Sequence, residues 1–229
     1  MNNEVRLSNF FIEKTTNLGI EIESLAKYDV YQLCLTLKYY YPTISWRDFE
    51  LLARHIDNNI DLAYFRSKLL QQRQLLPVLS PVIQNKFKII DDYILRIPEA
   101  DLPMVALLMH GDEIISLRHN TQGMLGHAEV NCLVEGQAKL GQKYLTNCEL
   151  FCNFEPCLMC CGVILQSRIK MLHYADREYH TGAVASQLQV LDNHKINPHT
   201  WYAGPYFLGE YVNDLQRFFR ECRNKSHAV

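Results

Sequence analysis

The sequence lacks any apolar run long enough to cross a membrane. A transmembrane helix needs about 18 or more consecutive apolar residues, and polar or charged side chains interrupt each apolar stretch of this chain well before that length. Residues 1–11 also lack the apolar core and the small-residue cleavage site of a secretory signal peptide. Eight cysteines without an export signal indicate a reducing compartment. We therefore expect a cytoplasmic protein with no membrane partner.

An excess of charge of one sign is missing as well. Lys and Arg number 23 against 25 Asp and Glu, which gives a formal net charge of −2. The basic excess that is typical of nucleic-acid-binding proteins is therefore absent from the composition, and any RNA-binding surface has to be a local groove. Proline and glycine are scarce, at 8 and 10 of 229 residues. This composition is typical of a globular protein of one or two domains.

The first third of the chain has the apolar spacing of helices. Apolar side chains recur at helical intervals over residues 30–41 and again over residues 62–69. Between them, Ser45 with Asp48 three residues later is typical of a helix N-terminus. No motif with chemical meaning occurs here. The sequence therefore predicts an all-helical N-terminal domain of unknown role over residues 1–77.

The segment 76–81 contains two prolines and is the predicted domain boundary. A second domain, residues 81–229, follows it. Its pattern predicts, in order, a helix over about 81–95, a hairpin of strands 104–109 and 113–117, a helix from His127 to near Gly141, a strand at 150–154, a helix after Pro156, a strand at 170–174, and an amphipathic C-terminal helix. Alternating helices and strands indicate an α/β fold.

Two short motifs carry the chemistry of this second domain. His127-Ala128-Glu129 opens one predicted helix, and Pro156-Cys157-Leu158-Met159-Cys160 opens another. The i, i+3 spacing of Cys157 and Cys160 places both sulfurs on one helical face, and a helix N-terminus favours the thiolate that binds metal. One imidazole and two thiolates suit tetrahedral zinc, with a fourth position open for water. Glu129 is placed to take a proton from that water, so we predict it to be the catalytic acid and base.

A Cys-x-x-Cys motif by itself is also typical of redox pairs and of structural zinc sites. A structural site needs a fourth ligand, but the adjacent Cys161 points to another side of the helix. A redox pair leaves His127 and Glu129 without a role. The combination therefore favours catalytic zinc. No role is assigned to the remaining cysteines, because free cysteine is commonly a small core residue.

These motifs resemble the cytidine-deaminase-like superfamily of zinc deaminases. The superfamily resemblance rests on His127–Glu129 and Glu155–Gly162. A closer resemblance to the bacterial tRNA-specific adenosine deaminase branch rests on later segments, namely Ser167–Ile169, Thr181–Ser186, Val190–Leu191, Asn197 and Leu215–Arg220. The resemblance covers residue 81 to the end. Two features depart from it: the segment Asp176–His180 is rearranged, and the N-terminal domain is additional.

The resemblance implies a fold, a cofactor and substrate contacts. The fold is a three-layer α/β/α arrangement around a mixed five-stranded sheet. The cofactor is one zinc ion held by His127, Cys157 and Cys160, and family members are commonly dimers. Asn120 stands where relatives contact the nucleoside, and the backbone N–H of Ala128 is an expected donor to the base. The N-terminal domain would then either cover the dimer surface or contribute to the substrate channel.

Three functions remain in view. The first is hydrolytic deamination of adenosine to inosine in RNA, with a tRNA as the partner and a C–N bond of a cyclic amidine as the bond that breaks. The second uses the same chemistry on a free base, nucleoside or nucleotide of the guanine or cytosine type. The third is a zinc-held binding protein without turnover. Glu129 argues against the third, because a structural site needs no carboxylate there.

Overall fold

The computed structural model describes residues 11–20, 29–57, 59–71, 73–98, 101–193, 195–208 and 211–226. The chain divides into two compact units, Met1–Ser80 and Pro81–Val229. In the part of the chain that is described, no helix is long and apolar enough to cross a membrane.

The described part of the first unit is built mostly from helices. A helical segment at residues 11–17 precedes α2 (Val30–Tyr40), α3 (Trp46–Ile56) and α4 (Leu62–Gln71). Helix α3 starts with the predicted capping box: the Ser45 hydroxyl accepts the Asp48 N–H at 3.3 Å, and the Asp48 carboxylate accepts the Ser45 N–H at 3.2 Å.

One prediction for this unit is wrong. Gln74–Leu75 form a strand, β1, so residues 1–77 are not helical throughout. Two residues are too few to show the alternation by which a strand is recognised in a sequence. The predicted helical character of residues 1–10 and 21–28 lies outside the described residues.

A mixed sheet forms the centre of the second unit. The predicted hairpin consists of β2 (Val105–His110) and β3 (Glu113–His119), which pair antiparallel. Strand β2 also pairs antiparallel with β4 (Cys148–Phe154), and β4, β5 (Met171–Asp176) and β6 (Trp201–Ala203) run parallel to one another. With β1 the sheet has six strands, so the predicted count of five is wrong.

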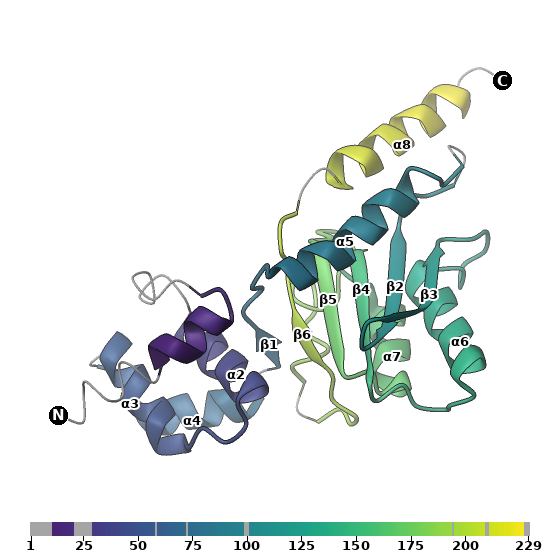
Figure 1. Ribbon diagram of the computed structural model, residues 1–229. Coiled ribbons are helices and arrows are strands. Elements are labelled where there is room, and N and C mark those ends of the chain that lie inside the picture. Colours follow the sequence, from purple (N-terminus) through teal and green to yellow (C-terminus); the bar gives the residue numbers. More distant parts are fainter. Residues whose placement is uncertain are drawn as a thin grey trace. The chain divides into compact units, whose positions relative to one another are not determined.

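Helices cover both faces of this sheet (Figure 1). Helices α6 (Ala128–Leu140) and α7 (Leu158–Ser167) pack on one face, in a core that includes Leu108, Leu150 and Leu172. On the other face, α5 (Pro81–Ile94) and the start of α8 (Tyr211–Ser226) cover a core that includes Leu107 and Phe151. Neighbouring strand residues thus contribute to opposite cores, as the period of two requires. The result is the expected three-layer α/β/α arrangement.

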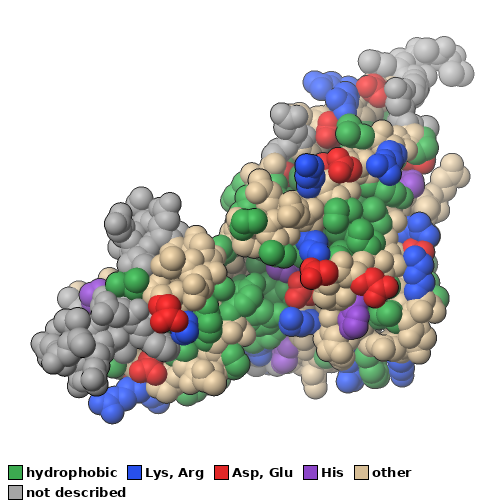
Figure 2. Space-filling view, in the orientation of Figure 1, with side chains coloured by type: hydrophobic (Ala, Val, Ile, Leu, Met, Phe, Trp, Pro, Cys, Tyr) green, Lys and Arg blue, Asp and Glu red, His purple; other side chains and the backbone are tan. Residues whose placement is uncertain are grey.

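The strand directions decide where a site can form. Strands β4 and β5 are parallel, so both end at the same edge of the sheet. The segments that follow them, residues 155–157 and 177–186, lie at that edge, which is where open α/β sheets place their ligands. On the face of the second unit visible in Figure 2, acidic and basic side chains are interspersed. Among the described side chains of that face, basic residues do not gather into one large patch.

Candidate metal centre and pocket

The predicted metal ligands stand at the beginnings of two helices. His127 is the N-cap residue of α6 and Cys157 is the N-cap residue of α7, with Cys160 in the first turn of α7. An N-cap side chain ordinarily accepts a backbone N–H of the first turn. Neither His127 nor Cys157 makes such a bond. Their side chains are directed at each other instead.

The structure brings the three side chains together in one small triangle. Cys157 Sγ lies 3.6 Å from His127 Nδ1 and 3.6 Å from Cys160 Sγ, and Cys160 Sγ lies 3.4 Å from His127 Nδ1. Zn–S bonds of about 2.3 Å and Zn–N bonds of about 2.0–2.1 Å at tetrahedral angles imply ligand separations of roughly 3.5–3.8 Å. The observed triangle therefore fits one zinc ion. Cys161 lies apart from it, with its thiol directed at the carbonyl of Pro156.

The surroundings favour a thiolate at Cys157. A hydrogen bond from the Cys160 thiol, together with the backbone N–H groups of Cys160 and Met159 and the nearby His127, lowers the pKa of Cys157 to about 5. Glu129 shifts in the opposite direction: burial, with the charge of Cys157 as a smaller contribution, raises the pKa of its carboxyl group. The site thus combines a ready thiolate with a carboxyl group that holds its proton more tightly than usual.

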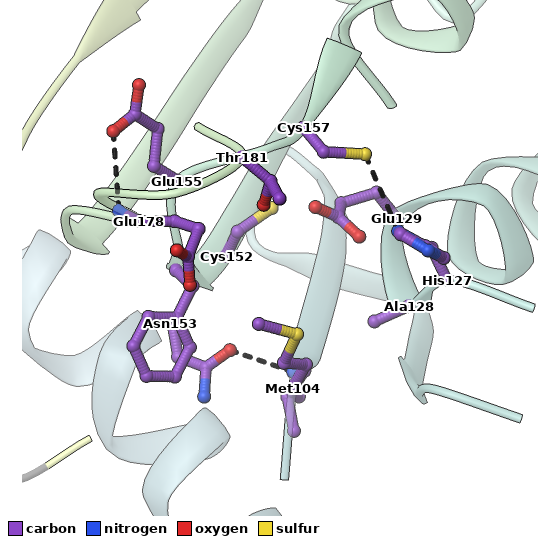
Figure 3. Close-up of a pocket in the computed structure, with 12 residues that line it drawn as sticks. Met104, His127, Ala128, Glu129, Cys152, Asn153, Glu155, Cys157, Glu178 and Thr181 are labelled. Carbon is purple, nitrogen blue, oxygen red and sulfur yellow. Dashed lines mark hydrogen bonds between the residues drawn. The ribbon is translucent and has the colours of Figure 1, made fainter. Parts of the chain in front are cut away.

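A pocket opens beside this triangle (Figure 3). It encloses about 360 Å³ between atoms, a volume that includes open solvent at its mouth. Glu129 and Ala128 line it together with two of the ligands. The full lining is Met104, Val105, His127, Ala128, Glu129, Cys152, Asn153, Phe154, Glu155, Cys157, Glu178 and Thr181.

The two predicted substrate contacts are hydrogen-bonded to each other. Asn120 Oδ1 accepts the backbone N–H of Ala128 at 2.8 Å. Asn131 holds the loop between them, because its side-chain amide donates to the carbonyl of Gly126 and to the hydroxyl of Thr121, both at 3.2 Å. Ala128 lines the pocket, whereas Asn120 is not among the lining residues.

Three polar residues of this pocket had no role predicted from the sequence. Glu155, Glu178 and Thr181 line it from the segments that follow β4 and β5. The signal for Glu155 was its place directly before Pro156, at the end of a buried strand, where an ionisable side chain needs partners. Glu178 and Thr181 lie in a loop without periodicity, so only the fold reveals their position.

A sheet covered by helices, with His-x-Glu at one helix start and Pro-Cys-x-x-Cys at another, defines a zinc-dependent deaminase. The family model of the cytidine and deoxycytidylate deaminase zinc-binding region matches residues 92–176. The chain is 33% identical over 130 residues to the tRNA-specific adenosine deaminase of Aquifex aeolicus, a match that spans 55% of this chain and 85% of that protein. It therefore belongs to the zinc-dependent deaminase family that includes the tRNA-specific adenosine deaminases.

The chain is also similar to a second tRNA-specific adenosine deaminase and to a solved structure. The tRNA-specific adenosine deaminase of Haemophilus influenzae is 37% identical over 100 residues, which span 43% of this chain and 57% of that protein. A solved structure from a study of A-to-I editing by tRNA:A34 deaminases is 25% identical, covers 49% of this chain and 85% of its own, and gives a TM-score of 0.44.

Proposed function

We propose that this protein deaminates adenosine to inosine in tRNA by hydrolysis. The observation that carries the proposal is the triangle of His127, Cys157 and Cys160 with Glu129 in the same pocket. The same chain matches most of a protein named as a tRNA-specific adenosine deaminase.

The three residues of the triangle and the adjacent Glu129 each have a proposed role. His127, Cys157 and Cys160 would hold zinc, which when bound supplies a Lewis acid that activates water near neutral pH. Glu129 would take a proton from the attacking water and deliver protons to ring nitrogen N1 and to the exocyclic amine at C6. The C6–N bond then breaks, ammonia leaves, and the oxygen of water remains on C6 as the carbonyl of inosine.

Substrate contacts are proposed for Asn120 and Ala128. Ala128 lines the pocket at the start of α6. Its N–H donates to Asn120 Oδ1 at 2.8 Å in the structure, so it would have to exchange that partner to donate to the base. The Asn120 side chain accepts that same N–H through its oxygen. Its amide group donates to the Met104 sulfur at 4.0 Å and keeps a second hydrogen as a donor for the nucleoside. The target base has to leave its stack to enter a pocket of this size.

We further propose two domains, residues 1–77 and 81–229. The N-terminal domain would either cover the surface through which family members dimerise or contribute to the channel for tRNA. Comparing the full chain with a chain that begins at Ser80 tests this, by light scattering for the homodimer and by turnover on tRNA. An unchanged mass together with unchanged turnover would exclude both roles.

A cytoplasmic location is also proposed, because the ligand thiols must stay reduced to bind metal.

The deciding experiment measures ammonia release and product mass with the zinc-loaded protein on two pools. One pool is total tRNA, and the other is a panel of free bases, nucleosides and nucleotides. Glu129→Ala serves as the blank. We expect new inosine in the tRNA. Turnover confined to the small molecules would instead identify a free-base or nucleotide deaminase, and absence of turnover in both pools would favour a zinc-held binding protein.

A further inference from the structure

Glu155 is a buried carboxylate at the end of β4, and only 3% of its surface is exposed. Its Oε1 accepts three consecutive backbone N–H groups, those of Val184 at 3.0 Å, Ala185 at 2.7 Å and Ser186 at 2.9 Å. Its Oε2 accepts the Glu178 N–H at 3.4 Å and the Ser186 hydroxyl. Successive backbone N–H groups that converge in this way form a strong site for an anion, and here the protein supplies the anion itself.

These partners of the Glu155 carboxylate all belong to one segment, residues 178–186, which we name the wall loop. It contributes Glu178 and Thr181 to the lining of the pocket. Figure 3 shows the Glu155 carboxylate bonded to the Glu178 backbone on the side of the pocket opposite His127 and Glu129. Glu155, which also lines the pocket, therefore lies across it from His127 and Glu129 and is bonded to the wall loop.

The same loop is tied to the metal-binding segment. Gly182 forms an isolated antiparallel bridge with Cys157, and the Ala183 N–H donates to the carbonyl of Pro156 at 2.9 Å. A Cβ atom at Gly182 would lie 2.6 Å from the Glu155 carboxyl group and 2.4 Å from the Glu178 carbonyl oxygen. The backbone thus approaches the carboxylate so closely that only glycine fits there.

We propose that Glu155 is a positioning residue that fixes the wall loop and thereby determines how well the pocket binds its substrate. It acts through Glu178 and Thr181, while Glu129 and the metal ligands determine the chemical step. The part of the proposal that concerns substrate rests on the proposed function. The part that concerns the loop does not depend on it.

Glu155→Gln in the full chain is the principal test. The amide oxygen still accepts the three consecutive N–H groups, but the new NH₂ group opposes the Glu178 N–H. We expect hydrogen exchange of residues 178–187 to accelerate at least about tenfold, because a charge-assisted bond is lost. Exchange in α6 and the zinc content should stay unchanged. KM for tRNA should rise roughly tenfold, with kcat within about threefold of wild type.

Two further variants keep this test decisive. Ser186→Ala removes only the hydroxyl bond to Glu155 and should produce the same changes to a smaller extent, even if Glu155→Gln fails to fold. Ile90→Ala deletes a fully buried side chain of α5 in the core on the other face of the sheet. It should lower Tm without changing KM or the exchange of the wall loop.

The outcomes separate the two proposals. Wild-type protein without turnover on tRNA would contradict the proposed function, while the exchange data would still test the wall loop. Unchanged exchange at residues 178–187 in both Glu155→Gln and Ser186→Ala would overturn the positioning role. A KM change in Ile90→Ala equal to that of Glu155→Gln at the same loss of Tm would overturn it as well.

Discussion

Two of the histidines in the second unit, His127 and His173, have different surroundings. His127 faces two cysteine sulfurs at the edge of the sheet. His173 lies on β5 with 2% of its surface exposed; its ring stacks on Phe151 with centroids 4.4 Å apart, and its Nδ1 lies 2.8 Å from the Tyr206 hydroxyl. His173 is part of the packed core, whereas His127 takes its meaning from neighbours that are 30 residues away in the sequence. The partners of a histidine, rather than its burial, identify a metal ligand.

The largest effect should come from the ligands themselves. His127→Ala and Cys157→Ser should each lose zinc and all turnover, with lower stability, because the metal couples to folding. His173→Gln should retain one zinc ion per chain and turnover near wild type. Zinc content by plasma mass spectrometry and the release of ammonia measure this. Loss of zinc in His173→Gln would show that the distinction between the two histidines is wrong.

Glu129→Ala should retain zinc but lose activity by on the order of a thousandfold, since proton transfer by a positioned side chain contributes about 10²- to 10⁴-fold. Single-turnover inosine formation on tRNA measures this loss. Ser186→Ala offers a comparison at another pocket segment that does not reach the reacting atoms. Undiminished deamination by Glu129→Ala would refute the role of Glu129.

A smaller effect should separate the two functions of Asn120. Asp at this position still accepts the Ala128 N–H, but it lacks the amide donor. If the amide contacts the nucleoside as proposed, Asn120→Asp and Asn120→Ala should both raise KM by about tenfold. Steady-state kinetics at constant zinc content decide this. A wild-type KM in Asn120→Asp would mean that Asn120 only holds the start of α6.

The smallest effect concerns pH and the core histidine. Burial lowers the pKa of His173, although Glu149, at 3.7 Å from its Nε2, opposes this shift. As the pH falls, the unfolded chain therefore binds a proton at His173 before the folded chain does. The free energy of unfolding is thus highest above pH about 6.5 and decreases as the pH is lowered. Tm should drop by a few degrees between pH 7 and 5, and by less in His173→Gln. Equal drops would contradict this origin.

Glu149 titrates in a separate window. The nearby His173 imidazole, with Lys170 as a further partner, lowers the pKa of this half-buried carboxyl group to about 2. Its stabilising contribution is present above pH about 4.5 and is lost as the pH falls toward 2. Measurements between pH 7 and 5 therefore report on the histidine with little interference from Glu149.

The features that are local in the sequence were predicted well. The capping box at Ser45, the hairpin through Gly111 and the helices that begin at the two motifs all follow from spacing over a few residues. Strands β1 and β6 have two and three residues, which is too short for a periodic signal. The terminal helix α8 was predicted with one apolar face, yet Phe219 on that face is 46% exposed.

The parts of the site that were missed depend on contacts across long stretches of chain. Glu155 is recognised by backbone N–H groups 23 to 31 residues later. Nearly every residue type carries the same backbone N–H group, so no pattern of residues in the sequence predicts such a contact. The bond between Asn120 and Ala128 is hidden for the same reason, although both residues were named for their expected contact with substrate.

The starts of α6 and α7, which lack side-chain caps, have a consequence for the unfolding equilibrium of the chain. An ion that joins His127 to Cys157 closes a loop of 30 residues that contains α6 and β4. An ion that binds only the folded chain has to dissociate when the chain unfolds, and it joins two helix starts that lack side-chain caps. Zinc then stabilises the folded chain by mass action, and the midpoint of thermal unfolding should rise with the concentration of free zinc.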